Sequence, residues 1–373
     1  MVTLQEFGDS GIGSGFLRWS ATAGDRGASR DAISARVGKP REDPPLIHTA
    51  FVREHAQPVQ FDEFDGKIIQ SLLEDGRMVG KDLSTAVGLS EATISRRCGV
   101  FAETHSFDIC GFFDPWQCGC AAVELVSFAV QGNPQRSAER IAAMESVHRL
   151  SWMASGNRLC ALVTGVDAGA TLATRDEIAA ACPDLEHVST ETLVGIIQGH
   201  DPGVKASAKV HPLKLRESAR QRHTDLRLIR LLQQDLRMTY TGIAAALGTS
   251  ITLSGEHTKR IMTSGAVRPI GVYDRGLLGN PLTATVHISY SKGAANHARA
   301  LAQKLPANLI YLAAGPEQVI AEISVADENG VFEWIEKARH LGETRSIRWD
   351  PMHAIYKQTY DWAIPGATPS TAE

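Results

Sequence analysis

The sequence predicts an α+β fold of two winged helix-turn-helix domains, each followed by a ferredoxin-like sandwich domain with the order βαββαβ. Three observations predict this fold. Residues 61–105 contain three short helical patterns at the spacing of a helix-turn-helix. Similar residues recur 160 positions later. Each copy is then followed by the same alternation of strand and helix patterns.

The first helix-turn-helix is predicted from periodicity and capping. Apolar residues at helical spacing in Ile68–Leu73, and again in Leu83–Val87, predict two helices that each bury one face. Gly88 can end the second helix in a left-handed conformation, and Ser90 can cap the third helix by accepting a backbone N–H. Other small helical bundles can contain the same Gly-Leu-Ser junction, so the motif alone leaves that alternative open.

An internal repeat supplies the context. Identical residues recur at a constant offset of 160, both in the helical region and beyond it. A period this long indicates a duplicated pair of domains rather than a solenoid repeat. The matching pairs include Asp65 and Asp225, Ile69 and Ile229, Leu72 and Leu232, Arg77 and Arg237, Gly88 and Gly248, Gly111 and Gly271, Asp114 and Asp274, and Asp167 and Asp327.

Runs of β-type residues follow each helix-turn-helix. Phe107–Phe113 and Ala266–Tyr273 predict wing strands. The predicted sandwich strands are Ala121–Val130, Val147–Met153, Arg158–Gly165 and Leu185–Ile197, then Leu282–Tyr290, Leu309–Ala313, Gln318–Val325 and Thr344–Ile355. The predicted sandwich helices are Gln135–Ala143, Thr171–Ala181, Ala294–Lys304 and Gly330–Leu341. Such a sheet has one open face, which we expect to pack against a second sheet from the same chain or a partner.

Composition shifts divide the chain into seven segments. Residues 1–57 are rich in Gly, Ser, Arg and Asp and predict a disordered or loosely attached arm. The basic residues of 199–221 predict a solvated linker, with a phosphate-contacting strap as the alternative. The remaining segments are 58–114 and 222–274 for the winged helix-turn-helix domains, 115–198 and 275–362 for the ferredoxin-like effector and oligomerisation domains, and 363–373 for a tail.

Composition also limits the class of protein. Apolar content of 43% and charged content of 21% are those of an ordinary soluble protein. The chain contains no run of about 18 apolar residues and no basic-then-apolar leader, so we expect a cytoplasmic location and no membrane partner. The six cysteines lie in the first copy without zinc-site spacing, so we expect no metal site. We also expect no cofactor and no catalytic residues, because the common catalytic motifs are missing.

Charge is distributed unevenly between the two copies. Residues 205–268 contain 12 Lys and Arg against 4 Asp and Glu, whereas residues 61–105 contain 5 against 8. Any affinity of the first helix-turn-helix for phosphate would therefore depend on where Arg77, Lys81, Arg96 and Arg97 point.

The string Leu89–Arg97, LSEATISRR, and the exit Asp114-Pro115 followed by Gly119 carry a family resemblance. The chain resembles two Lrp/AsnC (feast/famine) transcriptional regulators fused in tandem, over residues 61 to 197 and 222 to 360. The resemblance implies double-stranded DNA as a partner, self-association into dimers or larger oligomers through the sheet domains, and an amino acid or similar small molecule as effector. By position it implies DNA contacts from Ser90, Glu91, Thr93, Ser95, Arg96 and Arg97.

The second copy departs from this pattern in its recognition helix. Gly255, Glu256 and His257 stand where the first copy has Ser95, Arg96 and Arg97. Glycine weakens a helix interior and glutamate repels phosphate, so we expect a weaker or altered DNA reader. Further contacts are expected there from Lys259 and Arg260.

The hairpin turns between the second and third sandwich strands lie where the family places its effector. The resemblance implies ligand contacts at Gly156, Asn157 and Gly315. An ordinary tight hairpin is the alternative, because an acidic residue common in the family is missing after both glycines.

Two other functions stay open. Siroheme decarboxylases resemble paired Lrp/AsnC units, which would make this chain an enzyme with a role for His148, His187, His287 or His297. These histidines do not occupy equivalent repeat positions, so we expect the chain not to be an enzyme. The second alternative is a ligand sensor whose helix-turn-helix domains serve only as a scaffold.

Overall fold

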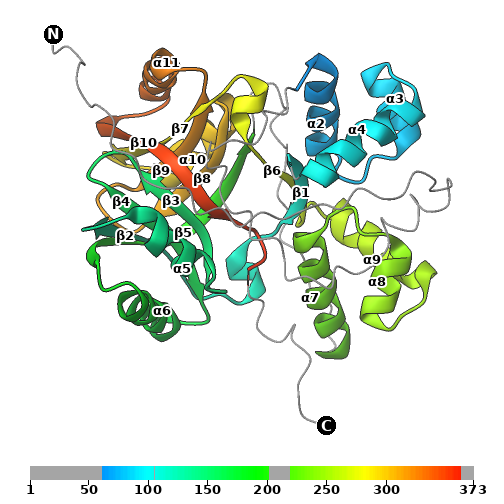
Figure 1. The fold of residues 1–373 in the computed structure, drawn as a ribbon, viewed down its shortest axis with the longest axis horizontal. Coiled ribbons are helices and arrows are strands. Elements are labelled where there is room, and N and C mark those ends of the chain that lie inside the picture. The colour runs from blue at the N-terminus through cyan, green and yellow to red at the C-terminus, as the bar shows by residue number, and fades with distance from the viewer. Residues whose placement is uncertain (1–60, 105, 201–218, 363–373) are drawn as a thin grey trace, which may run out of the picture. The chain divides into compact units, whose positions relative to one another are not determined.

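The computed structural model describes residues 61–104, 106–200 and 219–362 (Figure 1). The predicted arm and tail, and residues 201–218 of the predicted linker, lie outside this part of the chain. We call residues 61–200 the first half and residues 219–362 the second half. No helix within the described residues is both long enough and apolar enough to cross a membrane.

The two halves have the same order of elements (Figure 1). The first half contains α2 Glu63–Glu74, α3 Gly80–Val87, α4 Glu91–Thr104, β1 Phe107–Phe112, the 3-10 helix η1 Pro115–Cys118, β2 Ala122–Val130, α5 Pro134–Ala142, β3 Val147–Met153, β4 Arg158–Gly165, α6 Ala168–Ala181 and β5 Leu185–His200. The second half contains α7 Ala219–Gln234, α8 Tyr240–Leu247, α9 Ile251–Thr263, β6 Arg268–Tyr273, the 3-10 helix η2 Arg275–Leu278, β7 Leu282–Tyr290, α10 Ala294–Lys304, β8 Ala307–Ala313, β9 Val319–Val325, α11 Glu328–Arg339 and β10 Thr344–Gln358.

The predicted element types are confirmed, with shifts of a few residues at the ends. Two sandwich helices begin earlier than predicted because an aspartate caps each of them. The Asp167 carboxylate accepts the N–H of Ala170 at the start of α6, and Asp327 accepts the N–H of Gly330 at the start of α11. Strand β10 extends beyond its predicted end to Gln358, where it pairs with the other half.

Local capping fixes the first helix-turn-helix. Asp62 and Asp65 form a capping box at the start of α2, each carboxylate accepting the other residue's backbone N–H at 2.9–3.0 Å. Gly88 ends α3 with a φ of 80°, as predicted. The predicted cap at Ser90 is also confirmed, because its Oγ accepts the N–H of Thr93 at 3.2 Å.

The wing strands of the two halves pair with each other. Strands β1 and β6 form a two-stranded antiparallel sheet in which Cys110 lies opposite Ile270, its own counterpart in the repeat. Two arginines make reciprocal contacts beside this sheet. Arg77 donates to the carbonyls of Leu236 and Met238, whereas Arg237 donates to the carbonyls of Gly76 and Met78. The helix-turn-helix domains therefore face one another through near-symmetric contacts.

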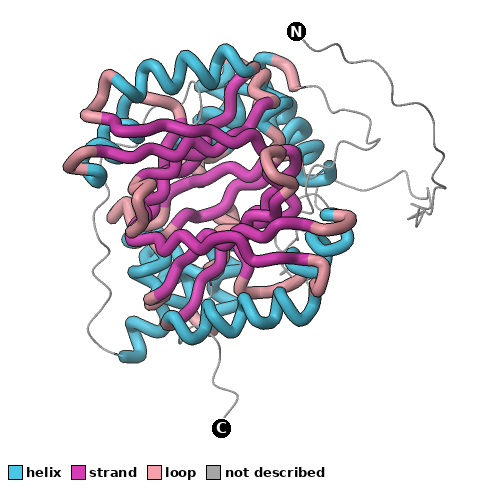
Figure 2. The backbone as a smooth tube through the Cα atoms, turned by 90° about the vertical axis from the view of Figure 1, so that its left-hand side faces the viewer, coloured by secondary structure: helices cyan, strands magenta, loops and turns pink. Residues whose placement is uncertain are grey.

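The eight sandwich strands form one closed antiparallel sheet in the order β10-β3-β4-β2-β5-β8-β9-β7 (Figure 2). The halves meet at two seams, where β5 pairs with β8 and β10 pairs with β3. Each half therefore supplies the cover that the other half's open sheet requires, and closure leaves the sheet without edges. Helices α5 and α6 pack mainly outside the first half's strands, and α11 packs outside the second half's strands. Helix α10 packs against β8 and, across the seam, against β5, and α5 also contacts β10.

The interior of the closed sheet is continuous with the helix-turn-helix core. One hydrophobic cluster includes Ile68 of α2, Leu162 of β4 and Leu309 of β8. Trp362 is fully buried in this cluster, and its indole N–H donates to the Phe113 carbonyl at 2.6 Å. This contact ties the end of the second half to the first wing strand.

Candidate functional site

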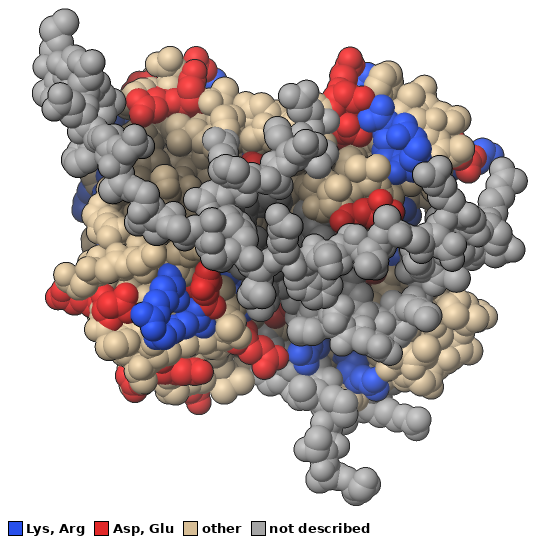
Figure 3. Space-filling view, in the orientation of Figure 1, with Lys and Arg blue, Asp and Glu red and all other residues tan. Residues whose placement is uncertain are grey.

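The recognition helix α4 presents its predicted contact residues unequally. Ser90, Glu91, Ser95 and Arg96 are exposed, whereas Thr93 is half-buried and its hydroxyl lies 2.9 Å from the Ser90 hydroxyl. On the face shown in Figure 3, acidic and basic side chains lie close together over this domain. Arg96 is therefore the cation of α4 that the fold leaves directed toward solvent.

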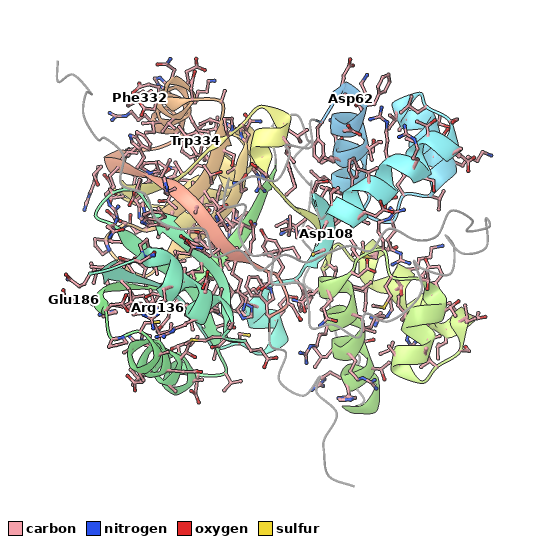
Figure 4. All side chains as sticks on the ribbon, viewed as in Figure 1. Asp62, Asp108, Arg136, Glu186, Phe332 and Trp334 are labelled. Carbon is pink, nitrogen blue, oxygen red and sulfur yellow. The ribbon has the colours of Figure 1, made fainter. Side chains whose placement is uncertain are left out.

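Arg97 is directed inward rather than toward solvent. Its guanidinium bonds Asp62 at 2.8 Å and Asp65 at 2.7 Å, both at the start of α2, where Figure 4 labels Asp62. The hydrogen bond from Arg97 lowers the pKa of Asp62. Arg97 thereby joins the recognition helix to the capping box of α2. Its predicted role in DNA binding stays untested.

In the second half, an arginine at a different position links the third helix to the first helix of the helix-turn-helix. Arg260 of α9 bonds Asp225 of α7 at 2.5 Å, and the Asp225 side chain is fully buried. Asp225 is the repeat counterpart of Asp65, whereas Arg260 lies about one helical turn beyond His257, the counterpart of Arg97. Lys259 is exposed beside it. Arg77 and Arg237, by contrast, are committed to the contacts between the halves.

The exposed face of α9 is more apolar than that of α4. Ile251 and Leu253 are 55% and 39% exposed, and Glu256 stands at the position of Arg96. Gly255 lies beside the ring of Tyr240, which is itself 41% exposed. The carboxylate of Glu256 at the centre of this surface would repel a phosphate backbone.

The predicted ligand residues lie at the seams of the closed sheet. Gly156 and Asn157 form the β3–β4 turn with positive φ values of 74° and 45°. The Asn157 amide accepts from Trp152 at 3.0 Å and donates to Val130 at 3.1 Å, so the turn itself uses its side chain. Gly315, in the β8–β9 turn, lies so close to Glu191 of β5 that a Cβ atom would stand 2.8 Å from the carboxylate.

A charged cavity of about 60 Å³ lies inside the closed sheet, lined by both halves. Arg149 of β3 forms an ion pair with Glu322 of β9, with 2.6 Å between Nη1 and Oε2, and both side chains are at most 6% exposed. At one seam, Arg158 bonds Asp350 of β10 at 2.6 Å. The Tyr311 hydroxyl is buried in the described structure without a hydrogen-bond partner, and burial raises its pKa well above the usual value. The volume is enough for a few water molecules.

Sequence reasoning missed this cavity, although a signal was present. Arg149 and Glu322 are charged residues inside strands whose other residues are almost all buried, and a charge at such a position needs a partner. Burial opposes the charged form of Arg149, but the electrostatic effects of Glu322, Tyr311 and Tyr360 together outweigh it and raise the pKa of the guanidinium. The identity of the partner was hidden because it lies in the other half of the chain.

The four histidines of the enzyme alternative have separate local partners. His148 is buried, lies 2.8 Å from the Thr164 hydroxyl and packs against Trp362. His287 contacts Glu317 at 2.9 Å, and hydrogen bonds from His287 and then Arg348 lower the pKa of that carboxyl to about 2. The other two are His187, beside Thr190, and His297, over the ring of Tyr290. Within the described residues, no cluster of three or more His, Cys, Asp or Glu could hold a metal ion.

Acid is expected to destabilise the protein through His148. Burial lowers the pKa of its imidazole from the usual 6.5 to about 3. Between pH 6.5 and about 3, His148 is therefore protonated in the unfolded chain but neutral in the folded chain. The folded state keeps its full stability above pH 6.5 and loses stability as the pH falls toward 3. The free energy of unfolding should fall by about 1.4 kcal/mol per pH unit from this group. Urea unfolding between about pH 7 and pH 5 measures the slope.

His148→Asn provides a variant that suits the site. Asn308 is the repeat counterpart of His148 and donates to Ser324 at 3.0 Å, much as His148 contacts Thr164. His148→Asn should therefore fold and show a shallower acid slope, whereas His187→Asn, at an exposed position, should keep the original slope. An unchanged slope in His148→Asn would show that other groups cause the acid sensitivity.

Comparisons with known proteins give one domain match. The model of the AsnC-type helix-turn-helix domain matches residues 61–98. No curated protein matches the chain.

Three solved structures illustrate what the fold is similar to. The siroheme decarboxylase NirDL, in complex with an iron-uroporphyrin III analogue, has 12% identity and a TM-score of 0.49, over 79% of this chain and 93% of that chain. An AsnC family transcriptional regulator from Agrobacterium tumefaciens has 17% identity and a TM-score of 0.32, over 36% and 92%. The leucine response regulatory protein LrpA of Mycobacterium tuberculosis has 21% identity and a TM-score of 0.31, over 35% and 90%.

The domain match covers α2, α3 and most of α4, the elements that place Ser95 and Arg96 on the surface. Residues 61–98 therefore match an AsnC-type helix-turn-helix domain in sequence and contain its helices in the structure.

Proposed function

We propose that the chain is a sequence-specific DNA-binding transcriptional regulator of the Lrp/AsnC type. The observation that carries this proposal is the AsnC-type helix-turn-helix at residues 61–98, whose α4 exposes Ser95 and Arg96. Hydroxyl and guanidinium groups can reach base edges and phosphate oxygens from a helix in the major groove. The protein acts in the cytoplasm, where its DNA lies.

One chain supplies two Lrp/AsnC units in this proposal. The repeated order of elements and the constant offset of 160 support a tandem duplication. The pairing of β1 with β6, and of the sheets along two seams, supports a covalent pseudo-dimer with one helix-turn-helix in each half. Further self-association would use surfaces outside the closed sheet.

The two recognition helices have different roles in this proposal. Helix α4 reads DNA through Arg96, whereas α9 carries Glu256 at the same position and contributes at most backbone contacts through Lys259. The effector is an amino acid or a related small molecule. The seams that contain Gly156, Asn157 and Gly315 are where the halves could shift relative to one another when it binds. Calorimetric titration with the amino acids tests this, and flat traces for all of them would remove a conventional effector.

DNA binding is tested with duplex DNA from the region upstream of the protein's own coding sequence. Specific binding should weaken with salt, because each neutralised phosphate releases about one counterion. Arg96→Ala should lower the magnitude of the log–log salt slope by about one and weaken binding roughly tenfold. Fluorescence anisotropy at several salt concentrations measures both quantities.

Arg136→Ala is the matched control. Arg136 is exposed on α5, where Figure 4 labels it, and removing it changes the net charge by the same amount. The control should leave the slope and the affinity unchanged. If the wild-type protein bound no duplex specifically at low salt, the regulator proposal would fail in favour of the scaffold-only sensor or the enzyme.

A further inference from the structure

The charged pair inside the sheet breaks the symmetry of the repeat. Strand register equates the two halves residue by residue: Arg149 pairs with Leu162 between β3 and β4, and Leu309 pairs with Glu322 between β8 and β9. Arg149 and Leu309 are therefore counterparts, as are Leu162 and Glu322. At these positions the first half carries an arginine and a leucine, whereas the second half carries a leucine and a glutamate.

The two symmetry-related places in the sheet interior are consequently built differently. One holds the Arg149–Glu322 ion pair, which crosses from one half to the other. The other holds Leu162 and Leu309, both in the hydrophobic cluster that also contains Leu193 and Tyr311. An apolar pair evidently fits this position in the fold, so an ion pair is not required for packing.

The charged place is organised around its two ions. Arg149 also donates from Nε to the Ser151 hydroxyl at 3.2 Å, and Asn308 donates to Glu322 at 3.2 Å. The arginine and glutamate side chains are 6% and 1% exposed. Either ion without the other would be a buried, uncompensated charge, which is among the most unfavourable features a core can contain.

Some other contacts between the halves would also be available to like halves. Arg77 and Arg237 are repeat counterparts and donate to backbone carbonyls, which are present whichever halves meet. Asp350, the partner of Arg158, has Glu191 as its counterpart: Asp350 pairs with Thr285 on β7 as Glu191 pairs with Leu125 on β2. A first half would therefore offer Arg158 an acidic partner as well.

We propose that the Arg149–Glu322 pair determines which halves can close the sheet together: a first half pairs with a second half and not with another first half. Two first halves from different chains would bury two arginines opposite Leu162. Two second halves would bury two glutamates opposite Leu309. The sheet face that carries Arg149 therefore selects a half that carries Glu322, from the same chain or from another copy. This selection does not depend on DNA binding.

The test uses cysteine pairs in the full chain as reporters of the seam. Met153 lies opposite Met352 and Leu193 lies opposite Ala313, so Met153 and Ala313 are counterparts. In a pairing of two first halves, residue 153 of one chain would therefore lie opposite residue 193 of the other. Met153→Cys with Leu193→Cys reports like halves through an interchain disulfide, and Leu193→Cys with Ala313→Cys reports the observed closure through an intrachain disulfide.

Each cysteine pair is introduced into the wild-type chain and into the double variant Arg149→Leu/Glu322→Leu. The four proteins are then refolded under oxidising conditions at about 0.1 mM chain. The wild-type charges should give the intrachain bridge and no bridge between residues 153 and 193. The leucine pair should give the 153–193 bridge in about one chain in ten, because a covalent connection imposes an effective concentration on the order of 1 mM. Mass spectrometry identifies each bridge.

Two results would overturn the proposal. One is a 153–193 bridge in the wild-type charge background. The other is its absence from the leucine pair while the intrachain reporter still forms, because the sheet would then close correctly without the ion pair. A charge reversal, Arg149→Glu with Glu322→Arg, should behave as the wild type, and like-half bridging in that variant would also contradict the proposal.

Discussion

Replacing Glu322 by leucine is expected to lower the free energy of unfolding by about 3–5 kcal/mol, because the Arg149 guanidinium is left buried without its carboxylate. The Asn308 amide also loses the acceptor that it contacts at 3.2 Å. Chemical unfolding in urea, followed by circular dichroism, measures the change. Arg149→Leu should be destabilising to a similar extent, because it leaves the glutamate buried instead.

The double variant separates the cost of a lone charge from the value of the pair. Arg149→Leu with Glu322→Leu reproduces the Leu309 and Leu162 pair of the symmetry-related place. Its stability should return to within about 1 kcal/mol of the wild type or exceed it, since apolar replacement of a buried ion pair is often neutral or stabilising. A single Glu322→Leu variant as stable as the wild type would mean that water or another group compensates Arg149.

Features that depend on residues near in sequence were predictable. Gly88 with a positive φ, Ser90 as a cap and the tight turn at Gly156 each follow from a few neighbouring residues, and the structure has them. Alternating apolar residues likewise gave the strands, because the side-chain period of a strand is a local property. The bounds shifted where a cap such as Asp167 acts beyond the apolar pattern.

Features that depend on the pairing of the halves were not predictable. An open sheet face can be covered by a partner chain or by the same chain, and periodicity is the same in both cases. The β5–β8 and β10–β3 seams became evident only with the fold. Arg97 shows a related limit within one half. Its carboxylate partner Asp65 is 32 residues away, and nothing in the neighbouring sequence distinguishes Arg97 from the solvent-facing Arg96.

The repeat could have identified the inward arginines. Asp65 and Asp225 stand at matching positions in the two copies, and both are buried: Asp225 is fully buried and Asp65 is 7% exposed. Buried aspartates at the start of two helices require cations, and helices α4 and α9 each supply one. The exact counterpart of Arg97 is His257, whereas the arginine that bonds Asp225 is Arg260, about one helical turn further along. A comparison of the two copies at a fixed offset therefore does not align the two arginines.

Arg260→Ala is accordingly expected to destabilise the second helix-turn-helix by about 3 kcal/mol, because Asp225 loses its guanidinium in a fully buried position. Arg97→Ala should cost less in the first domain, about 1–2 kcal/mol, because water can reach the half-exposed Asp62 that shares the contact. Hydrogen exchange of the amides in α8 and α3 measures the two domains separately, and a local loss of 3 kcal/mol corresponds to exchange about a hundredfold faster.

Lys259→Ala is the control for Arg260→Ala, because Lys259 is an exposed neighbour on the same helix. It should leave amide exchange in α8 unchanged, and equal protection in all three proteins would contradict an anchoring role for Arg260. The same comparison separates two effects on DNA binding. An arginine that contacts phosphate changes the salt slope at constant stability, as expected for Arg96, whereas an arginine that anchors the recognition helix lowers stability. Arg97→Ala should therefore weaken binding with accelerated exchange in α3 and an unchanged salt slope.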